Sequence, residues 1–155
     1  MQIKIDDVTH LKVAELLQQH LDDMYATSPA ESVHALDLDK LRQTDITFWT
    51  AWQQHDLLGC GALKTISAQH AEIKSMRTAR QHLRKGVAAQ MLEHIIQQAK
   101  VWDIKRISLE TGSQPFFQPA IALYKRYNFE FCEPFADYKD DPNSKFMTLV
   151  LGCAG

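Results

Sequence analysis

The segment Arg84-Lys85-Gly86-Val87-Ala88 offers the clearest chemistry in this chain of 155 residues, because it joins two cations to a glycine where an amphipathic pattern begins. The first turn of a helix carries unpaired backbone N–H groups and a partial positive charge, and both attract phosphate. Gly86 lets a ligand approach the backbone closely, and Ala88 keeps the turn small. The segment therefore predicts a pyrophosphate cradle, although an ordinary strand-to-helix connection explains the same spacing equally well.

The charges of the chain are unevenly distributed around this segment. Residues 74–106 carry eight basic and two acidic side chains, a local charge of +6, whereas the remainder carries −8 and the whole chain −2. A basic segment inside an acidic protein favours a local anionic ligand over a general polyanion such as DNA. No G-x-x-x-x-G-K-S/T or G-x-G-x-x-G motif provides another phosphate site.

Hydrophobic periodicity predicts the elements that hold this segment in place. Residues 8–23 repeat apolar side chains at helical spacing, and residues 86–102 form a strong amphipathic helix. Residues 46–53 and 57–66 are typical of a hairpin, and 71–77 of a third strand. The sequence further predicts strands at 2–5, 105–110, 129–133 and 146–151, a helix over 119–127 and a short helical turn over 38–43.

The order of these elements and the length of the chain predict one domain over residues 1–155. We expect an α/β (α+β) fold with a mixed, mostly antiparallel sheet of about six to seven strands and helices on both faces. Cys60, Cys132 and Cys153 are too widely spaced to indicate a zinc site or a disulfide framework. The seven histidines show no paired metal spacing, so we expect no metal. The start of the chain lacks a signal-peptide pattern and no apolar run is long enough to span a membrane, which predicts a cytoplasmic protein.

Two motifs resemble those of a known superfamily. The turn at Arg84-Lys85-Gly86-Val87-Ala88 resembles the acetyl-CoA signature of the GNAT acyltransferases, Q/R-x-x-G-x-G/A. The segment Ala120-Ile121-Ala122-Leu123-Tyr124-Lys125-Arg126-Tyr127-Asn128-Phe129 resembles the A-x-x-L-Y-x-x-x-G-F segment of the same superfamily. The element order matches as well, so the resemblance covers nearly the whole chain. More narrowly, residues 109–112, 134–138 and 141–144 resemble a bacterial subgroup of N-acetyltransferases.

The sequence departs from the superfamily pattern at three positions. Leu83 stands where the signature has Gln or Arg, and the adjacent Arg84 is the candidate to replace it. Asn128 replaces the usual glycine, which a left-handed helix C-cap permits. Phe117 occupies the place where many relatives carry an asparagine toward the cofactor, which suggests apolar contact there.

The resemblance implies that acetyl-CoA binds in a cleft between the strands that end near Arg77 and Glu110. It places the pantetheine arm against the backbone of residues 76–78 and the pyrophosphate against the N–H groups of residues 85–89. The cofactor-binding residues implied in this way are Met76, Arg77, Thr78, Arg84, Lys85, Gly86, Val87, Ala88, Ala89 and Phe117.

The resemblance also implies direct attack of an acceptor amine on the thioester in a ternary complex. Tyr124 is the candidate general acid because of its place in the motif, with Tyr127 one turn later as a competitor. Glu72 is the candidate general base, and Glu110 at the end of the neighbouring strand is the alternative. Either carboxylate can instead be an ordinary surface group.

The expected partner is a primary amine of a small molecule, amino acid or peptide. Glu31, Asp137 and Tyr138 are candidates to hold a cationic amine, and His34 to meet a carboxylate. We expect no nucleic acid, no membrane, and a monomer or homodimer. The alternative is an acyl-CoA sensor that binds the cofactor without turnover. A nucleic-acid-binding protein ranks last, because the acidic remainder repels a polyanion and no base-reading motif is present.

Overall fold

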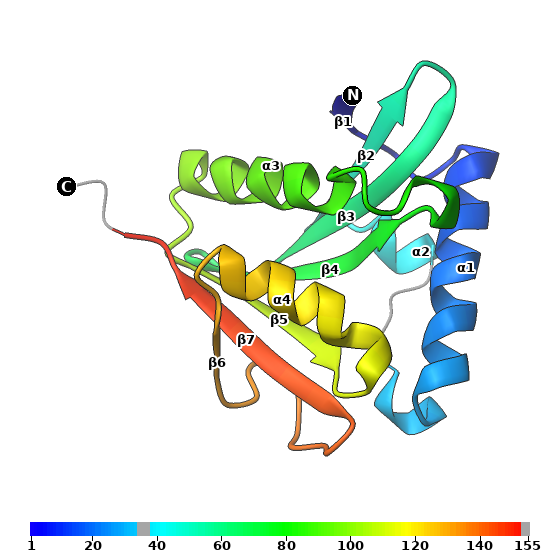
Figure 1. The fold of residues 1–155 in the computed structure, drawn as a ribbon. Coiled ribbons are helices and arrows are strands. Elements are labelled where there is room, and N and C mark those ends of the chain that lie inside the picture. Colours follow the sequence, from blue (N-terminus) through cyan, green and yellow to red (C-terminus); the bar gives the residue numbers. More distant parts are fainter. Residues whose placement is uncertain (34–37, 153–155) are drawn as a thin grey trace.

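The computed structural model describes residues 1–33 and 38–152, and a seven-stranded sheet organises them (Figure 1). The strand order is β1-β2-β3-β4-β5-β7-β6. All neighbouring strands are antiparallel except β4 and β5, which run parallel. The strands are β1 (Gln2–Ile5), β2 (Ile46–Gln53), β3 (Asp56–Ser67), β4 (His70–Thr78), β5 (Arg106–Gly112), β6 (Glu130–Phe131) and β7 (Ser144–Val150). The predicted mixed, mostly antiparallel sheet is confirmed.

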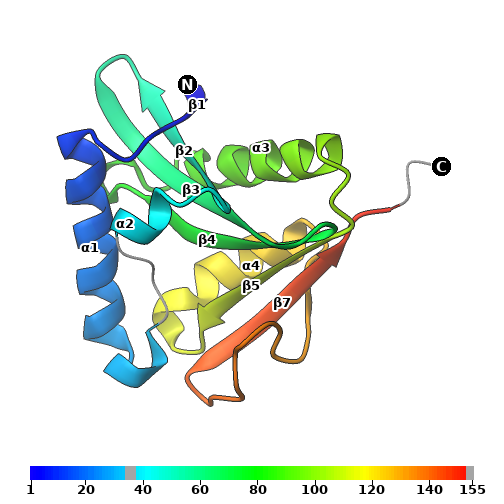
Figure 2. The same cartoon turned by 180° about the vertical axis from the view of Figure 1, so that it is seen from behind.

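Helices cover both faces of this sheet, as Figures 1 and 2 show from opposite sides. One face carries α1 (Leu11–Thr27) and α2 (Leu38–Leu41), and the other carries α3 (Val87–Val101) and α4 (Gln118–Arg126). Short 3-10 turns lie at Ala30–Ser32, Arg80–His82 and Pro115–Phe117. None of the helices within the described residues is long and apolar enough to cross a membrane.

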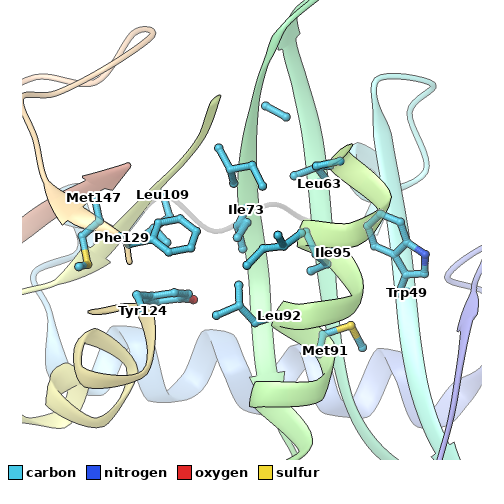
Figure 3. Close-up of a cluster of buried hydrophobic side chains, with 14 of the residues drawn as sticks. Trp49, Leu63, Ile73, Met91, Leu92, Ile95, Leu109, Tyr124, Phe129 and Met147 are labelled. Atoms are coloured by element: carbon cyan, nitrogen blue, oxygen red, sulfur yellow. The ribbon is translucent and has the colours of Figure 1, made fainter. Parts of the chain in front are cut away.

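Each face of the sheet has its own apolar core. The core beneath α3 and α4 includes Trp49, Leu63, Ile73, Met91, Leu92, Ile95, Leu109, Tyr124, Phe129 and Met147 (Figure 3). The core beneath α1 and α2 includes Val13, Leu16, Leu17, Leu41, Phe48, Trp52, Leu57 and Cys60. A fully buried Leu or Ile side chain contributes about 1.5–3 kcal/mol, so these clusters are what holds the helices to the sheet. The predicted apolar stripe of residues 86–102 is the face of α3 that is buried.

The first helix begins later and ends later than the periodicity predicts. His10 is its N-cap, and its Nδ1 atom accepts a hydrogen bond of 3.0 Å from the backbone N–H of Lys12. Val8 is buried, but its φ is 62° and its N–H donates to Asp6 Oδ1 at 2.8 Å. Val8 therefore reaches the core from a turn and not from a helix. An apolar residue in such a turn cannot be told from a helical one by spacing alone.

The strands β4 and β5 pair over four residues and then separate. Their register runs from His70 opposite Arg106 to Ile73 opposite Leu109. Beyond these pairs the two strands diverge toward their C-terminal ends, as Figures 1 and 2 both show. Near the point of separation, β4 has a bulge at Ser75, whose φ is 56°. Between two successive pairs with β3, the strand β4 contains two residues where β3 contains one. The bulge bends the strand locally, and the sheet is split where the predicted cleft lies.

Candidate active site

A cavity of about 640 Å³ opens where β4 and β5 separate. Its walls come from α1, β4, the start of α3, β5, α4 and the connection between β6 and β7. This volume lies in the range of small-molecule and cofactor sites. The cavity therefore lies where the resemblance to the superfamily implies a cleft, between the strands that end near Arg77 and Glu110.

The two sides of the cavity differ in chemistry. The helices α3 and α4, with the turn before α4, contribute mainly apolar side chains, namely Val87, Ala88, Met91, Phe117, Ala120 and Leu123, together with the phenol of Tyr124. The helix α1, the two strands and the β6–β7 connection contribute the polar side chains His20, Asp23, Glu72, Lys74, Arg77, Glu110 and Tyr138. Because α1 and the two strands also contribute Met24, Ile73, Met76 and Leu109, the cavity offers apolar surface beside its charged groups.

The predicted phosphate cradle stands at the entrance to α3. Gly86 is the N-cap of this helix with φ 79°, a left-handed conformation that glycine adopts without strain. A Cβ atom at Gly86 would meet open space, so the backbone conformation and not crowding requires the glycine. Of the predicted cofactor residues in this segment, Val87 and Ala88 line the cavity. Arg84 and Lys85 are exposed beside it.

Two of the three residues that depart from the superfamily pattern, Leu83 and Phe117, are part of the cavity wall. Leu83 lines the cavity and is 57% exposed, next to the cationic pair that follows it. Phe117 also lines the cavity and packs on Gly112, where any Cβ atom would collide with its ring. The expectation that Phe117 offers an apolar surface to a ligand thus agrees with its position.

Tyr124 lies on α4 with its ring packed edge-on against Phe129, the centroids 5.5 Å apart (Figure 3). The side chain is buried and lines the cavity. Burial raises the pKa of Tyr124 above its usual range, so the phenol keeps its proton at physiological pH. The competitor Tyr127 instead donates a hydrogen bond of 2.5 Å to Glu93 Oε1 and lies outside this cavity.

Glu72, Lys74 and Tyr138 form a connected cluster in the cavity wall. The hydroxyl of Tyr138 donates to Glu72 Oε2 at 2.6 Å, and Lys74 Nζ lies 3.3 Å from the same oxygen. Lys74 Nζ also donates to the hydroxyl oxygen of Tyr138 at 2.9 Å. Burial, followed by the charge of Glu72, raises the pKa of Tyr138 above its usual range. Glu72 is therefore held by two donors inside the protein.

Glu110 is the second carboxyl group of the cavity. Burial raises its pKa from 4.5 to about 7; the side-chain hydrogen bond with Ser144 and the charge of Lys74 oppose this rise, and the nearby carboxylates of Glu72 and Asp141 add to it. No ion pair involves Glu110 among the residues that the structure describes. A carboxyl group with this pKa can exchange a proton near neutral pH.

The α1 wall holds a second charged cluster. Arg77 Nη2 lies 2.6 Å from Asp23 Oδ2, and Arg80 Nη2 lies 2.5 Å from Asp23 Oδ1. Burial, helped by the charge of Arg77, lowers the pKa of His20 to about 4, so its imidazole is neutral at pH 7. The side chain of Arg77, named in the sequence as a cofactor residue, is thus joined to α1.

The predicted acceptor residues are not brought together. Tyr138 lines the cavity, whereas Glu31 and Asp137 are exposed and do not line it. His34 lies outside the described residues. Sequence reasoning missed Lys74, although strand alternation offered a signal, because a residue two positions after Glu72 shares its face of the sheet. No cluster of three potential metal-ligating side chains occurs in residues 1–33 and 38–152.

Comparisons with known proteins connect this architecture to a family. Residues 13–129 match the model of the acetyltransferase (GNAT) family. The chain is 57% identical over 151 residues to the "uncharacterized N-acetyltransferase YsnE" of Bacillus subtilis (strain 168), covering 97% of this chain and 100% of that protein. It is 49% identical over 149 residues to the "uncharacterized N-acetyltransferase YedL" of Escherichia coli (strain K12), covering 96% and 94%. A solved Bacillus subtilis acetyltransferase in complex with CoA shares the fold, with a TM-score of 0.72 at 18% identity over 97% of this chain and 98% of that one.

The family match includes all the residues that line the cavity except Tyr138. Both relatives carry N-acetyltransferase in their names and align over nearly their full length. The expected fold and acyltransferase class are thereby confirmed, and the chain belongs to the acetyltransferase (GNAT) family.

Proposed function

We propose that this protein transfers the acetyl group of acetyl-CoA to a primary amine of a small molecule, amino acid or peptide. The observation that carries the proposal is the single cavity that joins the start of α3, the carboxyl group of Glu110 and the buried phenol of Tyr124. The amine attacks the thioester directly, with both substrates bound at once.

Acetyl-CoA enters from the side of α3 in this proposal. Its pyrophosphate meets the backbone N–H groups of residues 85–89, with Arg84 and Lys85 at the rim. The pantetheine arm lies in the split along the backbone of residues 76–78. Pairing of β4 with β5 ends at Ile73, so the edge of β4 beyond that residue faces the split and not another strand. Phe117 and the apolar wall cover the other side of the arm.

The reaction requires two protons to leave the acceptor nitrogen and one proton to reach the departing sulfur. Glu110, as its carboxylate, takes one proton from the acceptor ammonium and leaves a neutral amine. The amine nitrogen forms a bond to the thioester carbonyl carbon, the carbon–sulfur bond breaks, and the nitrogen releases its second proton to solvent as the amide forms. Tyr124 donates its phenolic proton to the departing thiolate and recovers a proton from solvent. Glu72 remains the alternative base, but it is already engaged by Tyr138 and Lys74.

A product assay tests the proposal. The protein is incubated with acetyl-CoA and with separate panels of amines, amino acids and peptides, and products are identified by mass spectrometry. We expect CoA and an acetylated amine in equal amounts with at least one panel, and loss of both with Glu110→Gln. Release of CoA that no acceptor accelerates would contradict the proposed transfer.

A further inference from the structure

Two carboxyl groups lie on neighbouring strands of the cavity wall. Glu72 pairs in register with Ser108, so Glu110 stands two residues further along β5 on the same face as Ser108. A hydrogen bond of 2.8 Å between His70 Nε2 and Ser108 Oγ shows that this face is shared by β4 and β5. Two nearby carboxyl groups compete for one proton, and their surroundings decide which of them ionises first.

The two carboxyl groups differ in their cationic partner, because Glu72 forms an ion pair with Lys74 and Glu110 forms none among the described residues. The ammonium of Lys74 is 3.3 Å from Glu72 Oε2, and both side chains are nearly buried, at 9% and 4% exposure. The hydroxyl of Tyr138 completes the contact by donating to the same oxygen. Inside a protein an ammonium and a carboxylate are retained as an ion pair only when such contacts compensate their lost hydration.

Glu110 has no ion-pair partner among the described residues, and its hydrogen-bonding neighbour is the uncharged side chain of Ser144 on β7. From β4 it faces Lys74 at longer range and the carboxylate of Glu72, and from the β6–β7 connection it faces Tyr138 and Asp141. The α1 wall adds no free cation close to it among the described residues. In that wall the imidazole of His20 is neutral at pH 7, and the guanidinium groups of Arg77 and Arg80 both form ion pairs with Asp23 of α1.

We propose that Lys74 is a positioning residue for acetyl transfer: it fixes Glu72 as its anionic partner, which leaves Glu110 to accept the proton of the acceptor amine. The inference rests on the function proposed above. Lys74 touches neither reacting group; it acts through the carboxyl groups on either side of it. Without its charge, two buried carboxyl groups face each other, and the pair must retain a proton to a higher pH.

Direct titration of the two carboxyl groups tests this role without any acceptor or cofactor. The protein is labelled with ¹³C at the glutamate side-chain carboxyl carbon, and Glu72→Gln and Glu110→Gln assign the two resonances. Titration from about pH 5 to about pH 9 is recorded for the wild type, Lys74→Met and Lys74→Arg. We expect the Glu110 midpoint to rise by about one pH unit or more in Lys74→Met, and Lys74→Arg to stay close to the wild type.

Lys139→Met is the matched control, because Lys139 is exposed on the same connection as Tyr138. It should leave the Glu110 midpoint unchanged. An unchanged midpoint in Lys74→Met would overturn the proposal. If Lys74→Met does not fold, the titration of the wild type alone tests the assignment. The assignment is overturned if Glu72, and not Glu110, is the group that titrates near neutral pH. Neither result depends on acetyl-CoA binding, so failure of this inference is distinguishable from failure of the proposed function.

Discussion

The phenol of Tyr124 faces the cavity, whereas that of Tyr127, one turn later, is bound to Glu93 outside it. We predict that Tyr124→Phe lowers turnover by about 100-fold, the usual effect of losing a general acid, and leaves acetyl-CoA affinity nearly unchanged. Thiol release during acetylation of the acceptor identified by the product assay measures turnover. Tyr127→Phe is the matched control and should keep wild-type turnover; equal turnover in both variants would remove Tyr124 from the reaction.

Glu110, the proposed general base, also affects the stability of the fold through its ionisation. Its pKa is raised from 4.5 to about 7 by burial, so the folded protein holds this proton more tightly than the unfolded chain. Its contribution to stability is fully present below pH 4.5 and is lost as the pH rises to about 7. We therefore predict that the stability of Glu110→Gln relative to the wild type increases from pH 5 to pH 8.

Urea unfolding of both proteins at the two pH values measures this difference. The same ionisation predicts that wild-type turnover rises with pH through about 7, because the ionised carboxylate is the active form. A difference in unfolding free energy that does not change with pH would contradict the raised pKa.

The sequence predicts the positions of single residues unevenly, and the roles of these residues stay predictions. Tyr124, Glu72 and Glu110 were named from their motif and strands, and the structure places all three at one cavity. The sequence does not indicate the contact between Lys74 and Tyr138, which lie 64 residues apart along the chain. Contacts between segments so distant leave no local spacing to detect.

At the scale of elements, the start of α3 depends on the left-handed conformation of Gly86. We predict that Gly86→Ala lowers the unfolding free energy by about 1 kcal/mol, since a side chain disfavours this conformation. Gly86→Asn should cost less, because asparagine tolerates it better. Gly152→Ala is the control, as this glycine also has open space around it and no positive φ. Thermal unfolding measures all three, and equal losses for Ala and Asn would contradict the conformational explanation.

Gly86 also tests the phosphate cradle. Gly86→Glu places a negative charge beside the first N–H groups of α3, where an anion is expected to bind. We predict that it abolishes acetyl-CoA binding measured by calorimetry, whereas Gly86→Asn retains most of it. Undiminished binding by the glutamate variant would refute the location of the pyrophosphate.

Most elements could be read from periodicity, because α3 and the hairpin of β2 and β3 bury regular apolar faces. The bulge at Ser75 and the start of α1 could not. Ser75 adopts φ 56° without glycine at that position, and Val8 enters the core from a turn. Tertiary packing determines both features, and local residue preferences do not reveal them.

At the scale of the whole molecule, the split between β4 and β5 opens one cavity that is lined by both apolar and charged side chains. The parallel pairing of β4 with β5 was implicit only in the resemblance to the superfamily, since strand spacing does not determine strand order. In the folded chain, basic residues of the segment 74–106 occupy two kinds of position relative to the cavity. Lys74 and Arg77 lie in the cavity wall, while Arg84 and Lys85 remain exposed at its entrance.

Titration of the purified protein with acetyl-CoA by calorimetry tests the central claim most directly, with CoA and ATP as comparison ligands. The account predicts saturable binding of acetyl-CoA and CoA at one site per chain and no comparable binding of ATP, because the split between β4 and β5 recognises the pantetheine arm as well as the phosphates. Absence of acetyl-CoA binding, or equal binding of ATP, would contradict it and would point first to Leu83 in the cofactor signature.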